Sequence, residues 1–203
     1  HHTGGSGIYL PSGGAASPNQ TSHWQHVNIK NNRIEYTNGM GLNYKRVRYG
    51  EISGNRLYRT GLGPTGEGYL GISVYQTSET ALNGIDCGDV MIKNNIVIEP
   101  GYGNDGQGRA LQIQTQLPNT VENNIFIGEA ASTNRDGIIV QWDEAHAIQY
   151  NTIINFGNAS GAYDIGSRST CEVKGNLIAR TSGTGTILAG TQIHNWIGSI
   201  GAA

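Results

Sequence analysis

The chain has 203 residues, 36% of them hydrophobic, and its 13 basic and 15 acidic residues give a formal net charge of −2. This length and apolar content suffice for one domain with a buried core. The charge balance lacks the basic excess of a nucleic-acid-binding surface, and the sequence contains no apolar run of about 18 residues that would span a membrane. The 31 glycines follow no collagen period and are typical of turn-rich β structure.

Short strand-like segments recur along the chain, and each begins with a small residue. They span residues 7–10, 41–44, 71–74, 110–113, 137–140, 162–165 and 186–189. Strand alternation places the second and fourth residues of each segment inward and the third residue outward. This alternation predicts that Gln112 and Asp164 face outward.

An asparagine recurs between these segments at the second place of a two-residue turn. The six turns are Asn31-Asn32, Gly54-Asn55, Asn94-Asn95, Asn123-Asn124, Tyr150-Asn151 and Gly175-Asn176. An apolar residue stands three places before each asparagine and another stands two places after it. Asparagine tolerates the left-handed conformation of a sharp turn, and stacked side-chain amides hydrogen-bond along a column. The pattern predicts an all-β solenoid with three short strands per rung.

The turns and the segments together resemble the right-handed parallel β-helix of the pectate-lyase-like superfamily, over nearly the whole chain. The resemblance implies about seven rungs, an Asn ladder at the tight turn between the second and third strands, and carbohydrate over the first strand. It also implies a secreted or extracellular protein that acts on or binds a polysaccharide. The fold hosts lyases, hydrolases, epimerases, phage tailspikes and adhesins, so it does not specify the activity.

We expect residues 1–203 to form a single β-helix domain that is a mature or trimmed piece of a longer chain. The sequence starts at His1 without a methionine, runs directly into a strand, and shows no obvious capping helix at its other end. Solenoid ends need caps to cover their core. We therefore expect open strand edges at both terminal rungs, and coverage by local loops is the alternative.

A basic cluster, Lys45, Arg46 and Arg48, lies on the second predicted rung, with Tyr75 on the third. Cations neutralise a uronate carboxylate and acidify its α-proton, so this cluster favours β-elimination on a uronic-acid polymer. In this interpretation Lys45 and Arg46 participate and Tyr75 assists. Further contacts to the polysaccharide are predicted for Trp24, Arg48, Asn43, Gln112, Gln114, Gln141 and Trp142. A solvated basic turn is the alternative.

Acidic residues offer a second chemistry. Asp143 and Asp164 lie on neighbouring predicted rungs, and glycoside hydrolysis needs two carboxyl groups, one as acid and one as base or nucleophile. Acidic turn residues are common, so a structural role is the alternative.

No cofactor is predicted with certainty, although Ca²⁺ binding is considered because several oxygen donors fall in predicted loops. These donors are Glu67, Asp86, Asp89 and Asp105. The histidines and cysteines form no cluster of the kind that binds zinc, so no metal site is predicted from them.

Apolar residues also fall on outward places of the strand that follows each turn. They are Ile96, Ile98, Ile125, Ile127, Ile154 and Leu177. An apolar outer face needs cover, so the pattern predicts a docking surface for another protomer or for an absent part of the parent chain. A register error of one residue or cover by a local loop is the alternative. This surface favours a rival function, a non-catalytic structural or adhesive β-helix in an extracellular assembly or filament.

Overall fold

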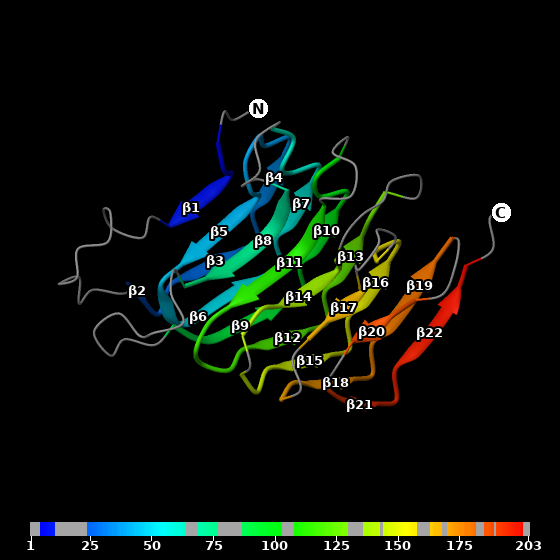
Figure 1. Ribbon diagram of the computed structural model, residues 1–203. Coiled ribbons are helices and arrows are strands. Elements are labelled where there is room, and N and C mark those ends of the chain that lie inside the picture. The colour runs from blue at the N-terminus through cyan, green and yellow to red at the C-terminus, as the bar shows by residue number, and fades with distance from the viewer. Residues whose placement is uncertain are drawn as a thin grey trace.

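The computed structural model describes residues 5–10, 24–63, 69–76, 87–102, 108–129, 136–142, 144–157, 163–167, 170–181, 185–188 and 190–200. Within these ranges every regular element is a β-strand, and the strands form three parallel sheets. The chain passes through the three sheets in turn and then begins the next rung. Figure 1 shows the rungs stacked between the two ends of the chain.

The sheets are numbered here in the order in which one rung visits them. Sheet 1 contains β1 (Ile8–Leu10), β5 (Leu42–Lys45), β8 (Leu70–Tyr75), β11 (Arg109–Gln114), β14 (Ile138–Val140), β17 (Ile165–Gly166) and β20 (Ile187–Leu188). Sheet 2 contains β2 (Trp24–Gln25), β3 (Asn28–Lys30), β6 (Val47–Ser53), β9 (Gly88–Lys93), β12 (Thr120–Glu122), β15 (Ala147–Gln149), β18 (Glu172–Lys174) and β21 (Thr191–Ile193). Sheet 3 contains β4 (Arg33–Glu35), β7 (Arg56–Tyr58), β10 (Ile96–Ile98), β13 (Ile125–Ile127), β16 (Thr152–Ile154), β19 (Leu177–Arg180) and β22 (Trp196–Ser199).

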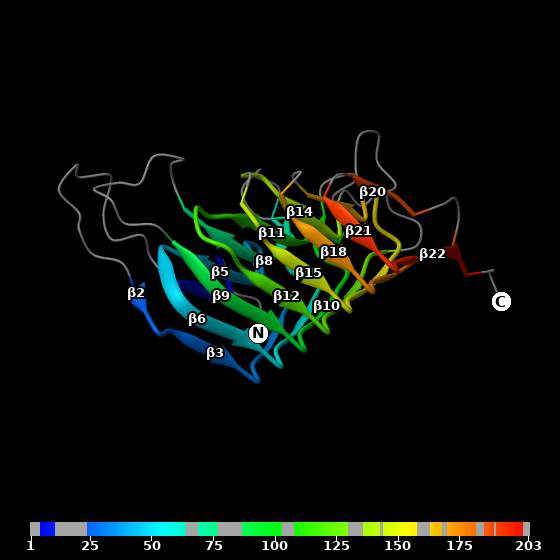
Figure 2. The ribbon, with the colours of Figure 1, turned by 90° about the horizontal axis from the view of Figure 1, so that it is seen from below.

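The strand pairing confirms the predicted right-handed parallel β-helix of about seven rungs. Each strand pairs in parallel with the equivalent strand one rung further along, as Leu57, Val97 and Phe126 do in sheet 3. Figure 2, seen from below, shows the tight turns between sheets 2 and 3 aligned along one edge of the solenoid.

The sixth predicted segment, 162–165, is the exception to the predicted register. Ile165 pairs with Ile138, so the fourth residue of this segment aligns with the second residue of the segment before it. The displacement moves Asp164 away from the outward place predicted for it. The outcome for the acidic residues is described with the site below.

Columns of apolar side chains fill the interior, with one residue of each column on each rung. The column in sheet 3 consists of Ile34, Leu57, Val97, Phe126, Ile153 and Ile178, all buried. Full burial of one such side chain stabilises the fold by about 1.5–3 kcal/mol. Because strands alternate, the residues before and after each buried one point outward.

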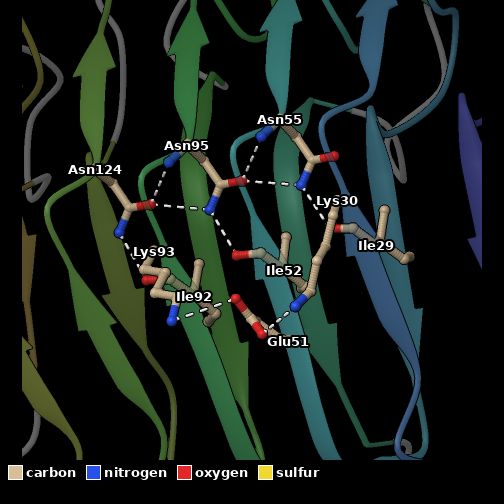
Figure 3. A network of polar contacts seen from close by, with 9 residues as sticks. All are labelled: Ile29, Lys30, Glu51, Ile52, Asn55, Ile92, Lys93, Asn95 and Asn124. Carbon is tan, nitrogen blue, oxygen red and sulfur yellow. Dashed lines mark hydrogen bonds and ion pairs between the residues drawn. The ribbon is translucent and has the colours of Figure 1, made fainter.

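The asparagine column runs along the turn that joins sheet 2 to sheet 3, as predicted. The backbone N–H and the side-chain Nδ2 of Asn55 both donate to Asn95 Oδ1 at 3.0 Å, and Asn95 Nδ2 also donates to the Ile52 carbonyl at 2.9 Å. Figure 3 shows three members of the column. The column includes Asn32, Asn55, Asn95, Asn124, Asn151, Asn176 and Asn195.

The structure corrects the sequence interpretation of this turn in two respects. The left-handed conformation belongs to the first turn residue, with φ 58° at Asn31 and 57° at Tyr150, and not to the stacked asparagine. A further member, Asn195, was not predicted because Gln192 stands three places before it, where the other turns have an apolar residue. The stacked asparagine is thus required for its amide rather than for its backbone, and the residue before it varies.

A second polar column lies inside sheet 2. The Val90 N–H donates to Asn119 Oδ1, and the Asn119 N–H donates to His146 Nδ1, both at 3.0 Å. His146 is buried, and burial lowers its pKa to about 4. Because Nδ1 accepts, the neutral ring carries its hydrogen on Nε2. In the part of the chain that the structure describes, that nitrogen has no hydrogen-bond partner.

The outer faces of sheets 2 and 3 differ in chemistry. On sheet 2, the Glu51 carboxylate bridges Lys30 at 2.5 Å and Lys93 at 3.3 Å (Figure 3). The hydrogen bond from Lys30 lowers the pKa of Glu51 to about 2. On sheet 3, the predicted apolar residues do flank the buried column on its outer side, and we call them the apolar stripe. The stripe consists of Ile96, Ile98, Ile125, Ile127, Ile154 and Leu177.

The two terminal rungs differ in how far their core is covered. In the first rung, Ile29 and Ile34 are each 7% exposed. In the last described rung, Ile197 pairs with Ile178 and continues the same column, but it is 39% exposed. The core residues of the last described rung are thus more exposed than Ile29 and Ile34 of the first, and the expectation of open strand edges at both ends stays a prediction.

Candidate functional site

Lys45 lies between two tyrosine rings on the outer face of sheet 1. The register aligns Lys45 of β5 with Tyr75 of β8, and Tyr9 of β1 with Asn43 of β5. Lys45 Nζ lies 5.4 Å from the ring centroid of Tyr9 and 5.5 Å from that of Tyr75. The negative face of an aromatic ring attracts a cation at this distance. The two rings therefore position the ammonium group on the sheet.

Polar side chains continue this face across the next rungs. Asn43 and Gln112 belong to one register column, and Gln114 aligns with Tyr75. Gln112 Nε2 donates to Gln141 Oε1 at 3.0 Å. Asn43 Oδ1 is buried and has no hydrogen-bond partner among the residues that the structure describes. Gln112, Gln114 and Gln141 are partly exposed on two neighbouring rungs and offer donors and acceptors there, which suits a ligand that carries several polar groups. Asn43 and Ser73, in the column of Gln112, are buried, so the contact to a polysaccharide predicted for Asn43 is not supported.

Tyr44 fixes the strand that presents Lys45. Its ring is fully buried, and its hydroxyl donates to the Val27 carbonyl at 2.5 Å. Burial raises the pKa of this hydroxyl. Glycine is required at position 50, because a Cβ there would lie 1.8 Å from the Tyr44 hydroxyl oxygen. The packed interior of the second rung thus holds β5 in place behind the outward lysine.

The other two residues of the predicted basic cluster lie away from this face. Arg46 is buried where the chain leaves sheet 1 for sheet 2, and its φ of 51° turns the corner. Arg48 follows on sheet 2, where its guanidinium lies 4.7 Å from the Tyr49 ring centroid and its Nε lies 3.9 Å from Asp89 Oδ2. Of the three basic residues, Lys45 alone shares a face with Tyr75.

The aromatic residues are also distributed differently from the sequence interpretation. Trp24 is exposed but belongs to β2 of sheet 2, and Trp142 is buried. Tyr9 was not predicted as a site residue, although the structure places its ring beside Lys45. The sequence did contain a signal for it, because Tyr9 is the third residue of segment 7–10 and alternation places that residue outward.

Asp164 is completely buried, so the prediction that it faces outward is wrong. Its Oδ2 accepts hydrogen bonds from Arg180 Nε at 3.1 Å, from Arg180 Nη2 at 2.6 Å and from the Thr186 N–H at 2.7 Å. Burial raises the pKa of the carboxyl group, and the hydrogen bond from Arg180 opposes that rise. This ion pair gives Asp164 a structural role in the sixth rung. Asp143 lies outside the described residues.

The four oxygen donors considered for Ca²⁺ are not brought together among the described residues. Asp89 lies beside Arg48, whereas Glu67, Asp86 and Asp105 lie outside the described ranges. In the described part of the chain, no three or more His, Cys, Asp and Glu side chains gather in a way that could hold a metal ion.

Comparison with protein-family models, with curated proteins and with solved structures finds no match for this chain. Among the described residues there is no helix long and apolar enough to cross a membrane. The geometry of the outer faces is therefore the basis for the functional proposals that follow.

Proposed function

We propose that the chain binds an acidic polysaccharide along the outer face of sheet 1, with Lys45 as the main contact. The observation that carries the proposal is the position of Lys45 Nζ, 5.4 and 5.5 Å from the ring centroids of Tyr9 and Tyr75. A uronate carboxylate would pair with the ammonium group. The apolar face of a sugar ring would lie against the Tyr9 ring, which is 48% exposed.

The polar groups on neighbouring rungs favour a chain-like ligand over a single sugar. Gln112, Gln114 and Gln141 lie on two neighbouring rungs along the outer face of sheet 1. A polysaccharide on this face would therefore meet further amide groups beyond Lys45. The resemblance of the sequence to the pectate-lyase-like superfamily supports the same ligand class, and from it we also propose a secreted or extracellular location.

Calorimetric titration with polygalacturonate and with a neutral polysaccharide of similar length tests this proposal. We expect binding to the uronate polymer only. Lys45→Ala should weaken it about tenfold or more, because a hydrogen bond to a charged group contributes about 1.5–3 kcal/mol. Lys174→Ala, on β18 of sheet 2, is the matched control and should leave the affinity unchanged. Equal affinities for the two variants, or no binding to any uronate polymer, would overturn the proposal.

A catalytic version of this function is β-elimination on the uronic-acid polymer. Lys45 would neutralise the carboxylate, and Tyr75, acting as its phenolate, would take the proton α to it and become the neutral phenol. The released electron pair forms a carbon–carbon double bond while the glycosidic C–O bond breaks, and the leaving oxygen takes a proton from water. The buried position of Arg46 at the corner does not support the direct role expected for it.

The ultraviolet absorbance of an unsaturated product tests the catalytic version. We expect absorbance to rise with wild-type protein and not with Tyr75→Phe, while both proteins bind the polymer. Binding without any unsaturated product would remove the elimination chemistry and leave the binding function. Release of reducing sugar without unsaturation would indicate hydrolysis, for which the ion-paired Asp164 offers no support.

A second candidate function is that of a structural or adhesive β-helix in an extracellular assembly. We propose self-association through the apolar stripe on sheet 3, because a contiguous apolar surface in water favours association. Exposed members include Ile125 and Leu177. Binding of a polysaccharide on sheet 1 and self-association through sheet 3 are compatible, since they use different faces.

A further inference from the structure

The outer face of sheet 1 presents two register columns of side chains along its first five rungs. The first column is Tyr9, Asn43, Ser73, Gln112 and Ile139. The second column is Lys45, Tyr75 and Gln114, and Gln141 continues it because the Gln141 N–H donates to the Ile113 carbonyl at 3.0 Å. Neighbouring strands lie about 4.8 Å apart, which is close to the length of one sugar residue in an extended polysaccharide. A polysaccharide along the solenoid axis therefore places a different sugar on each rung.

The second column is the one that such a ligand can follow. Lys45, Tyr75, Gln114 and Gln141 are all partly exposed. In the first column, by contrast, Asn43 and Ser73 are buried. From the second rung to the fifth, the ligand thus meets an ammonium group, a phenol ring and two amides, in that order.

Lys45 provides the charge on this face, and the groups beside it are neutral. Its neighbour Arg46 is buried at the corner, and Arg48 lies on sheet 2 beside Asp89. Arg109, which begins β11, is ion-paired with Asp136 at 3.0 Å. Among the described residues of the two columns, Lys45 alone is charged. The cationic part of this face is therefore one rung wide.

We propose that this face selects a mixed polysaccharide, in which one uronate on Lys45 is followed by neutral sugars on Tyr75, Gln114 and Gln141. This inference rests on the binding of an acidic polysaccharide proposed above and adds the charge pattern of the ligand. It distinguishes a chain that carries isolated uronates from a chain in which every sugar is a uronate.

The rungs of Lys45 and Tyr75 favour opposite charges. A carboxylate beside Lys45 forms a charge-assisted hydrogen bond with the ammonium group. The face of the Tyr75 ring carries partial negative charge, which attracts Lys45 Nζ at 5.5 Å from the ring centroid. The same face repels a carboxylate, whereas the apolar side of a neutral sugar can lie against it. The change from acidic to neutral sugar is therefore expected between the second rung and the third.

The amides on the next two rungs also favour a neutral sugar. Gln112 Nε2 donates to Gln141 Oε1 at 3.0 Å, and the Oε1 atom of Gln112 is an acceptor. A sugar hydroxyl can donate to this oxygen, whereas an ionised carboxylate can only accept. A uronate on these rungs would also lose part of its hydration without a cation to replace it. Sugar hydroxyls, which both donate and accept, match these groups better.

Galacturonate tetrasaccharides that differ only in methyl esterification test the charge pattern. A methyl ester removes the charge of a uronate and leaves the sugar ring unchanged. One ligand has all its carboxylates free, two have a single free carboxylate at one end or the other, and the last is fully esterified. Calorimetric titration should show that a ligand with one free carboxylate binds tightest. We expect its affinity to exceed that of the fully charged ligand about threefold or more, and that of the fully esterified ligand about tenfold or more.

The outcomes separate this inference from the function on which it rests. Equal or tighter binding of the fully charged ligand would overturn the charge pattern and leave the binding of acidic polysaccharides in place. Tightest binding of the fully esterified ligand, or no binding of any ligand with a free carboxylate, would overturn both.

A second cation on the same column tests where the following sugars lie. Gln114→Lys adds an ammonium group two rungs, or about 10 Å, from Lys45. It should strengthen binding of the fully charged tetrasaccharide about fivefold more than binding of the ligand with one free carboxylate. Gln149→Lys on β15 of sheet 2 is the matched control, because Gln149 is also partly exposed, and it should change neither affinity. Far-ultraviolet circular dichroism confirms that both variants fold. An equal gain from Gln149→Lys, or no gain from Gln114→Lys, would overturn the placement of the ligand along this column.

Discussion

The outer faces of sheets 2 and 3 belong to the same rungs and meet at the same turn, yet they carry opposite chemistry. On sheet 2, polar side chains pair from rung to rung, as Glu51 does with Lys30 and Lys93, and as Gln149 does with Glu122 at 3.2 Å. On sheet 3, the charged residues give way to the apolar stripe from β10 onward.

The difference shows which residues the fold requires and which it leaves free. An inward residue must fit the column that is buried by its neighbours, so the interiors of both sheets are mainly apolar. An outward residue is in contact with water, and the β-helix forms whether that residue is polar or apolar. A polar outer face is the expected default. An apolar outer face reduces solubility, which is the reason for the interaction surface proposed above.

The largest expected change in stability comes from removing one asparagine of the ladder, which runs along the turn between the two sheets. Asn95→Ala should destabilise the fold by about 4 kcal/mol, because several buried groups each lose a partner at about 1–3 kcal/mol. The affected groups are the Asn55 N–H and Nδ2, which lose Asn95 Oδ1, and the Ile52 carbonyl, which loses Asn95 Nδ2. Urea unfolding measures the change in the free energy of unfolding.

Asn32→Ala is the control for the ladder, since Asn32 is its first member and is only partly buried. We expect a loss of about 1 kcal/mol, because a single partly exposed step is removed. Equal losses of unfolding free energy for Asn95→Ala and Asn32→Ala would show that the buried amides inside the column stabilise the fold no more than the partly exposed first one.

The second prediction concerns the polar interior of sheet 2. The folded pKa of His146 is lowered from 6.5 to about 4. The unfolded chain therefore takes up the proton first as pH falls, and stability declines from pH 6.5 to about pH 4 and then levels off. The loss is about 1.4 kcal/mol per pH unit, or about 3 kcal/mol in total from this group. His146→Gln should remove this contribution. Equal slopes in urea titrations of variant and wild type would contradict the assignment.

The smallest expected effect concerns the ion pairs on the surface of sheet 2. Glu51→Gln should lower the melting temperature slightly at low salt, and the difference should vanish in 1 M NaCl, where the screening length is about 3 Å. The stabilisation by Glu51 is present above its ordinary pKa of 4.5 and is lost as pH falls towards about 2. Glu172→Gln, in the same register column on β18, is the control. A large drop in melting temperature that persists in 1 M NaCl would show that these ion pairs are not ordinary solvated surface contacts.

The repeat itself was predictable from the sequence because most rungs carry the same local pattern, an asparagine between two apolar residues. An asparagine between two apolar residues is needed wherever a buried amide must continue the ladder, as at Asn55 and Asn124. Where the interior departs from the rule, prediction failed. The last turn was missed because Gln192 takes the place of the apolar residue. The sixth segment has a different register, and in it the buried Asp164 pairs with Arg180. That pairing joins the start and the end of the sixth rung, 16 residues apart, which local spacing does not encode.

The candidate site was predictable only in part for a similar reason. Neighbouring rungs bring Lys45 and Tyr75 together, and the spacing of the segments places both on sheet 1. Arg46 and Arg48 follow Lys45 closely in sequence, but the left-handed residue at Arg46 turns the chain onto sheet 2. Residues that are close in sequence therefore lie on different faces when a corner of the solenoid separates them. Residues on neighbouring rungs, such as Tyr9 and Lys45, share a face and form the surface.

The amides of the ladder all point in the same direction, from Asn32 towards Asn195. An amide carries a dipole of about 3.5 D, and the sheets oppose this sum only weakly because their own net dipoles are small. The ladder is therefore a row of aligned dipoles whose positive end lies at the C-terminal rungs. The charged side chains oppose this direction, because residues 30–59 hold seven of the 13 basic residues and only two of the 15 acidic ones. The column that sets the register of the rungs thus also gives the turn between sheets 2 and 3 a polar direction of its own.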